Sequence, residues 1–200
     1  LVVDSTGNSI VCMDRYGSYA DVGIAMFDSS GTLVDQRILE TASPDEYSWD
    51  VALGPTGEVY VLGQAYSLNI MLLMKLTPAL DLVWAETVGN PYTYQEFTGI
   101  VAQPDGTIYA IGDAVSEFDG TTGPAVFHFV DSGDLIDSTY FPGTSSDASL
   151  LMYDAVSLPS GGILVSGASW GTPATTPVTF EGVEVTPVTD SWSADVVEWE

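Results

Sequence analysis

Carboxylates are the side chains of this sequence with the clearest capacity for chemistry. Asp50 and Asp154 each open a short apolar segment, at matching positions of a repeated pattern. Two carboxylates held about 5 to 10 Å apart beside a sugar can serve as the acid and base of a glycosidase. Enzymes of this kind usually surround such acids with Arg or His, and Arg15 alone lies in a bordering loop. We therefore expect no catalysis, with a fragment of a hydrolase or lyase as the alternative.

Histidine and cysteine each occur once, which limits the other chemistries. His128 is the middle residue of an apolar Phe-His-Phe segment, so we expect a packed strand position rather than a catalytic one. A lone histidine excludes His-cluster metal sites. Cys12 lies in an apolar pattern and is expected to be a buried small residue. Since the Gly-rich segments lead into strands, no nucleotide-binding motif is present, and no cofactor is expected beyond the hypothesis that follows.

Calcium is the one cofactor for which the sequence offers ligands. Asp131, Asp134 and Asp137 are grouped around a polar turn, and hard oxygen ligands suit Ca²⁺. Their spacing does not match the EF-hand loop. An Asp at the first position of a turn also has an ordinary explanation, because its side chain accepts a hydrogen bond from the backbone. The calcium site is a hypothesis with this alternative beside it.

The elements that position these side chains come from an internal repeat. Segments 57–63, 106–112 and 161–167 share a glycine, five residues rich in β formers and a second glycine. Segment 7–13 is a fourth copy, in which Met13 replaces the closing glycine. The copies recur about every fifty residues, a period typical of solenoids, propellers and arrays.

Each repeat holds four short strands joined by turn residues. The glycine-bracketed strand follows a short apolar strand and precedes two more, the last of which is expected at 32–39, 82–88 and 135–141. Four strands per repeat without a helical period predict an all-β fold, a β-propeller of four-stranded antiparallel blades. Tandem β-sandwiches are the rival, but they need about seven strands per unit.

The repeat boundaries divide the chain into four blades. The fourth carries an insertion, 171–193, between its second and third strands, and lacks an outer strand. We expect part of a larger ring, to which further blades or a second copy contribute. The predicted blades are 1–49, 50–98, 99–153 and 154–200.

The glycine-bracketed strands, the Asp-Ser turns at 28–31 and 131–133 and the Trp84 that opens a fourth strand resemble a known family. They are similar to the bacterial beta-propeller repeat often called SBBP, which is akin to quinoprotein-like propellers. The resemblance covers nearly the whole chain and implies a fold more than a function. The insertion 171–193 departs from the compact spacing of that family, and the Trp-Asp and kelch glycine patterns are absent.

Long connections fall on one face of the predicted blades, which we call the long-loop face. Alternate connections of an up-and-down sheet lie on opposite faces, and the second-to-third and fourth-to-first connections are long and variable. Exposed aromatic residues there would bind a carbohydrate or a protein partner, whereas aromatic residues that cap the blades would bind nothing. The candidates are Tyr16, Tyr19, Tyr92, Tyr94, Trp170 and Trp192.

The charge balance limits the classes of partner and the environments that suit this chain. The 28 acidic and three basic residues give a formal net charge of −25, which excludes nucleic acid and anionic membrane surfaces as partners. No apolar stretch is long enough to insert into a membrane. The excess of acidic residues indicates a halophilic environment or a surface that collects cations, or it merely keeps a β-rich chain soluble. We expect a secreted or cell-surface protein that acts as a binding or structural module.

Stability is expected to rise with salt. Repulsion among the carboxylates destabilises the compact state at low ionic strength, and added ions screen this repulsion. Melting curves in dilute buffer and in molar salt test this expectation, and equal melting temperatures would contradict it.

Overall fold

A computed structural model of the chain describes residues 1–39, 45–66, 68–89, 95–115, 122–140, 149–158, 161–170, 178–180, 183–185 and 193–199. Every regular element in these residues is a β-strand, as the sequence predicts. In chain order the strands are β1 (Val2–Val3), β2 (Ser9–Tyr16), β3 (Ala20–Phe27), β4 (Leu33–Leu39), β5 (Glu46–Leu53), β6 (Val59–Ala65), β7 (Ile70–Leu76), β8 (Leu82–Val88), β9 (Gln95–Ala102), β10 (Ile108–Val115), β11 (Thr122–Phe129), β12 (Leu135–Tyr140), β13 (Ser149–Ser157), β14 (Ile163–Trp170), β15 (Val178–Phe180), β16 (Val183–Val185) and β17 (Ser193–Trp199).

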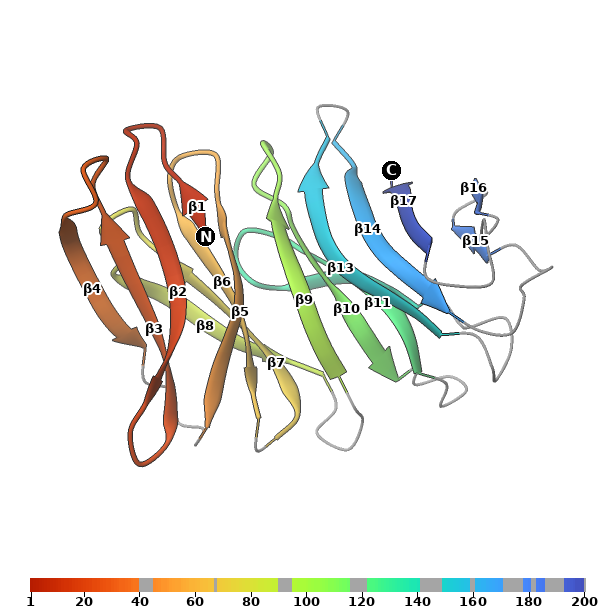
Figure 1. Ribbon diagram of the computed structural model, residues 1–200, viewed down its shortest axis with the longest axis horizontal. Coiled ribbons are helices and arrows are strands. Elements are labelled where there is room, and N and C mark those ends of the chain that lie inside the picture. Colours follow the sequence, from red (N-terminus) through yellow and green to blue (C-terminus); the bar gives the residue numbers. More distant parts are fainter. Residues whose placement is uncertain are drawn as a thin grey trace.

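The strands form successive antiparallel sheets that follow the chain. β1 to β4, β5 to β8 and β9 to β12 each make a four-stranded sheet in sequence order, and β13, β14 and β17 make a three-stranded one. Neighbouring sheets meet through their first strands, β5 against β9 and β9 against β13 (Figure 1). This is the blade arrangement of a β-propeller, as predicted, and the described blades form an open array rather than a closed ring.

The predicted insertion in the fourth blade contains a small hairpin of its own. Strands β15 and β16, which lie between β14 and β17 in the sequence, pair with each other as a separate two-stranded sheet. The hairpin was not expected from the sequence, because its strands have only three residues each.

The first strands of the second, third and fourth blades begin at Glu46, Gln95 and Ser149, ahead of the boundaries predicted at 50, 99 and 154. The reason is a β-bulge in each strand, where one residue has no partner in the ladder. A bulge breaks the alternation of apolar and polar residues, so only the second half of each strand was visible in the sequence. The unpaired residues are Trp49, Thr98 and Tyr153.

The closing glycine of the repeat lies opposite this bulge. A Cβ added at Gly63 would stand 2.5 Å from the carbonyl oxygen of Tyr47. At Gly112 it would overlap the carbonyl oxygen of Glu96 and stand 2.6 Å from the Cα of Phe97. Met13, which replaces this glycine in the first blade, lies opposite Gly23 of β3.

The short turns are alike in all four blades. In the turn after β1, the Gly7 N–H donates to the Asp4 carbonyl at 3.0 Å, and the Asp4 N–H donates to the Asn8 carbonyl at 2.9 Å. The same two bonds recur at 28–32, 54–58, 77–81, 103–107, 130–134 and 158–162. Leu80, with φ 61°, takes the place that glycine holds in the other turns. These turns leave the longer connections on the opposite ends of the strands.

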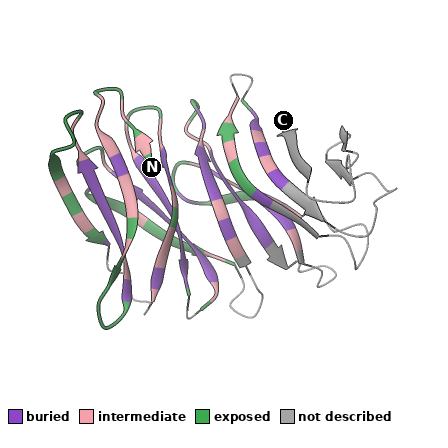
Figure 2. Cartoon of the chain, in the orientation of Figure 1, coloured by how far each residue is buried: buried purple, intermediate pink, exposed green. Residues whose placement is uncertain are grey.

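The core lies between the sheets and is densest in the second blade. All seven residues of β6 and all seven of β7 are buried (Figure 2). Of the fourth strands, β4 and β8 are mostly exposed and β12 is half exposed and half intermediate, as outer strands of blades should be. Rigid inner strands therefore position the side chains that border the array interior and the long-loop face.

Candidate functional site

Three tyrosines gather on the long-loop face between the first and second blades. Tyr16 ends β2, Tyr47 lies in β5 and Tyr66 follows β6. The ring centroids of Tyr16 and Tyr47 are 6.5 Å apart, and those of Tyr47 and Tyr66 are 5.4 Å apart in an edge-to-face contact. Tyr16 is 74% exposed and Tyr66 is 62% exposed. We call these three residues the tyrosine cluster, and it offers an aromatic surface to solvent.

Two aspartates hold the backbone beneath the tyrosine cluster. Asp45, at φ 61°, accepts a hydrogen bond from the Ala20 N–H at 3.1 Å, and its carbonyl accepts one from the Tyr66 N–H at 2.9 Å. The Asp14 carboxylate accepts hydrogen bonds from the Ser48 N–H at 2.7 Å and the Ser48 hydroxyl at 3.0 Å. These bonds join the first two blades and fix the strand ends that carry the tyrosines.

The Tyr47 phenol remains protonated at ordinary pH. Desolvation by its neighbours, and then the negative charge of Asp45, raise its pKa. A protonated phenol both donates and accepts hydrogen bonds. The tyrosine cluster therefore presents apolar ring surface and hydroxyl groups together.

The predicted aromatic residues of this face are only partly brought together. Tyr16 joins the tyrosine cluster, and Tyr19 is 59% exposed in the loop before β3. Tyr92, Tyr94 and Trp192 lie outside the described residues, as does the side chain of Trp170 at the end of β14. Sequence reasoning missed Tyr47, which lies in β5, and Tyr66, which lies in the connection between the second and third strands of its blade.

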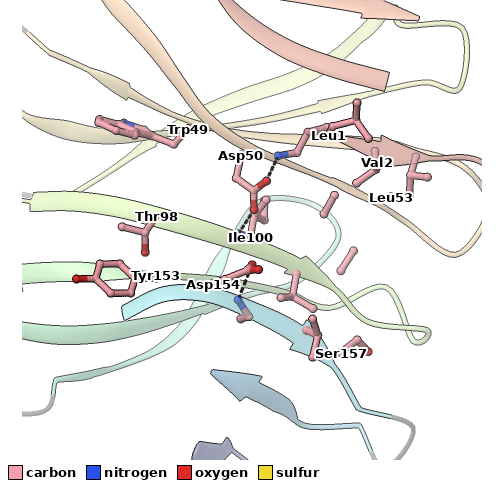
Figure 3. Close-up of a pocket in the computed structure, with 16 residues that line it drawn as sticks. Leu1, Val2, Trp49, Asp50, Leu53, Thr98, Ile100, Tyr153, Asp154 and Ser157 are labelled. Atoms are coloured by element: carbon pink, nitrogen blue, oxygen red, sulfur yellow. Dashed lines mark hydrogen bonds between the residues drawn. The ribbon is translucent and has the colours of Figure 1, made fainter. Parts of the chain in front are cut away.

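A second surface is an open groove along the first strands, which we call the inner groove. Its volume is about 610 Å³, and β1, β5, β9 and β13 all contribute to it. The unpaired bulge residues Trp49, Thr98 and Tyr153 lie along one side (Figure 3). Asp50 and Asp154 lie beside them, on the strands that flank β9.

Asp50 is held more tightly than Asp154. One oxygen of Asp50 accepts the Val51 N–H at 2.8 Å, and the other accepts the Ile100 N–H of the next blade at 3.0 Å. Burial raises the pKa of Asp50, the amide hydrogen bonds oppose this, and the Asp154 charge adds to it. Asp154 is exposed, and its carboxylate accepts a hydrogen bond from the Ala155 N–H at 2.8 Å. The groove thus has one anchored and one accessible carboxylate.

Burial of Asp113 in β10 makes the stability of the folded chain depend on pH. It is 7% exposed and its Oδ1 atom has no hydrogen-bond partner. Burial, and then the charge of Glu96, raise its pKa to about 7. The pKa of Asp in an unfolded chain is about 4. Between about pH 4 and pH 7 the folded state therefore binds more protons than the unfolded state, and the stability contribution of Asp113 falls as pH rises.

We expect Asp113→Asn to gain stability relative to the wild type as pH rises through that window. Urea denaturation of both proteins at about pH 4.5 and about pH 8 measures the difference. A difference in unfolding free energy that does not change with pH would contradict the assignment.

The three calcium candidates do not converge in this structure. Asp131 accepts hydrogen bonds from the Lys75 ammonium and the Tyr60 hydroxyl. Asp134 accepts the Ser132 hydroxyl at 2.7 Å, and Asp137 accepts the Ser138 N–H at 2.8 Å. Within the described part of the chain, no three His, Cys, Asp or Glu side chains are placed to hold a metal ion.

Calcium binding by Asp131, Asp134 and Asp137 remains a prediction with a direct test. Melting curves with calcium and with chelator would differ if a structural calcium were bound. Superposable curves would contradict the hypothesis.

His128 and Cys12 occupy packing positions. The His128 ring stacks on Tyr109, with centroids 4.3 Å apart and planes within 10°. Its Nε2 is buried without a hydrogen-bond partner, and burial lowers its pKa, so the neutral ring is favoured. Cys12 is half-buried, and desolvation raises the pKa of its thiol. Neither side chain contributes to the tyrosine cluster or to the inner groove.

Comparison with known proteins gives distant structural likenesses. No protein-family model matches the chain, and a search of curated proteins finds no match. A protein of unknown function from Bacteroides caccae is 12% identical (TM-score 0.41), with 90% of this chain and 72% of that one covered. A gluconolactonase from Xanthomonas campestris is 15% identical (TM-score 0.46), with 90% and 62% covered. The WD40 domain of SCAP from fission yeast is 11% identical (TM-score 0.35), with 100% and 55% covered.

No helix suited to crossing a membrane occurs among the described residues.

Proposed function

We propose that this chain is a non-catalytic binding module built of SBBP-like propeller repeats, extracellular or surface-exposed, that recognises its ligand through the long-loop face. The observation that carries the proposal is the tyrosine cluster. Three aromatic rings from two blades meet there, and the outer two are mostly exposed. Soluble proteins seldom expose several large aromatic rings together unless that surface binds something.

A carbohydrate is the ligand class that suits this surface best. Tyrosine rings pack against the apolar faces of sugar rings, and their hydroxyl groups hydrogen-bond with sugar hydroxyls. The hydrogen bonds of Asp14 and Asp45 hold the cluster in place, so little ordering is needed on binding. A protein partner is the other class expected for this face.

The test is an NMR titration with cellohexaose, xylohexaose and chitohexaose. We expect at least one of them to shift resonances of the tyrosine cluster, and Tyr66→Ala to weaken that binding about fivefold or more. Tyr153→Ala is the matched control, since this tyrosine is also about half exposed but lies in the inner groove. If no oligosaccharide perturbs the cluster, carbohydrate recognition by this face is wrong.

The alternative is a hydrolase or lyase, favoured by the two carboxylates of the inner groove. Burial raises the pKa of Asp50, as a general acid requires, and Asp154 is accessible. Against this, both Asp50 oxygens already accept backbone amide hydrogen bonds. Release of reducing or unsaturated ends from these oligosaccharides, abolished by Asp154→Asn, would support the enzyme over the binding module.

A further inference from the structure

We infer that the inner groove is a second ligand site, separate from the proposed long-loop face, and that it binds an aliphatic ammonium group. The ligand chemistry is a primary amine on a short alkyl chain, supplied by a free diamine or by a lysine side chain. The inference rests on the two carboxylates, the two exposed aromatic rings and the lack of any basic side chain in the groove.

The β-bulges create the groove wall. Trp49, Thr98 and Tyr153 occupy equivalent positions in three consecutive blades, and each lacks a ladder partner. Trp49 is 42% exposed and Tyr153 is 48% exposed, one on either side of Thr98 (Figure 3). Because the bulge recurs, the two aromatic rings border the same open space beside the carboxylates.

The groove's negative charge has no basic side chain beside it. The groove is lined by Asp50 and Asp154 but by no Lys, Arg or His. All three basic side chains of the chain are engaged elsewhere: Arg15 with Asp21 at 3.6 Å, Arg37 with Asp35 and Asp81, and Lys75 with Asp131 and Glu58. Asp154 is therefore a carboxylate with no basic side chain of the groove to pair with.

The two carboxylates of the groove repel each other. The charge of Asp154 raises the pKa of Asp50, in addition to the larger effect of burial. An ammonium group beside Asp154 would relieve this repulsion, which a neutral sugar would not do.

The aromatic side chains favour an organic cation over a metal ion. Ammonium groups are attracted to the faces of Trp and Tyr, and the alkyl chain packs on the rings. Metal ions prefer several oxygen ligands, whereas the groove has only the two carboxylates, and both Asp50 oxygens accept amide hydrogen bonds. The combination of ring faces and accessible carboxylate suits an alkyl ammonium.

The experiment is an NMR titration with 1,5-diaminopentane at constant ionic strength, with 1,5-pentanediol as the neutral isostere. We expect saturable shifts of the Trp49 indole resonance with the diamine alone. Asp154→Asn should weaken binding about fivefold, the effect of one partly exposed ion pair, and Trp49→Leu should weaken it similarly. A lysine derivative blocked at both backbone ends, compared with the diamine, distinguishes a peptide source from a free amine.

Asp137→Asn is the matched control for general attraction to an acidic protein. Asp137 is exposed and, like Asp154, accepts a hydrogen bond at 2.8 Å from the next backbone amide. Its replacement should leave diamine binding unchanged, as should Tyr66→Ala, which weakens only the proposed carbohydrate binding. Equal losses in the Asp154 and Asp137 variants, equal binding of the diol, or no saturable binding would each overturn the inference.

Discussion

Gly112→Ala is expected to lower the free energy of unfolding by about 3 kcal/mol. The added Cβ would overlap the carbonyl oxygen of Glu96 and stand 2.6 Å from the Cα of Phe97, and neither is the flexible end of a side chain. The bulged strand β9 must therefore move away from β10 to accommodate a methyl group. Urea denaturation measures the loss.

Gly17→Ala is the control for this glycine. A Cβ at Gly17 would lie 3.6 Å from the nearest atom, the carbonyl oxygen of Tyr19, which is an ordinary contact. We expect a change within about 0.5 kcal/mol. Similar losses at Gly17 and Gly112 would show that the close approach at the bulge is not the cause.

Asp131→Ala should cost about 2 kcal/mol, or roughly 4 to 8 °C in Tm. Lys75 has only 10% of its side chain exposed. The substitution removes the carboxylate to which both the Lys75 ammonium and the Tyr60 hydroxyl donate hydrogen bonds. The Glu58 carboxylate, whose Oε1 lies 3.9 Å from the Lys75 Nζ, would be the remaining acidic group near the ammonium. The expected cost is below that of a fully buried pair because the Asp131 side chain is 56% exposed. Thermal melting monitored by circular dichroism gives the shift.

Asp134→Ala provides the comparison within the same turn. Asp134 is exposed, and its side chain accepts a hydrogen bond from the Ser132 hydroxyl, so its loss should cost less than about 0.5 kcal/mol. Lys75→Met should recover part of the loss in the Asp131→Ala background, because it removes the buried charge left without its main partner. If the double variant is no more stable than Asp131→Ala, the ion pair is not the source of the effect.

The blade architecture was predictable because its determinants are local. Glycine at the turns, as at Gly7 and Gly106, is required by φ angles of 89° and 90°, and such residues recur visibly every blade. The glycine-bracketed strand was visible for the same reason, although its closing glycine is explained only by the opposing strand. The first half of each first strand was missed, since a bulge such as that at Trp49 disrupts the alternation from which strands are predicted.

The sequence indicates the face on which a candidate residue lies, but not which other residues it contacts there. Tyr16 was assigned to the long-loop face, yet its neighbour Tyr47 belongs to the next blade, and contacts between blades depend on packing that one repeat does not encode. The same limit explains Asp131. As a turn residue it was considered a calcium ligand, whereas its contacts with Lys75 and Tyr60 join the second and third blades.

Each pair of neighbouring blades is joined by polar side chains. Asp14 bonds to Ser48, Asp50 to Ile100, and Thr98 to Met152. In modular arrays, stability is the sum of unit and nearest-neighbour terms, so the interfaces decide whether the units unfold together. Cutting one such bond would therefore act on cooperativity: a single sharp transition would broaden or divide into two, with the boundary of the independent parts at the altered interface.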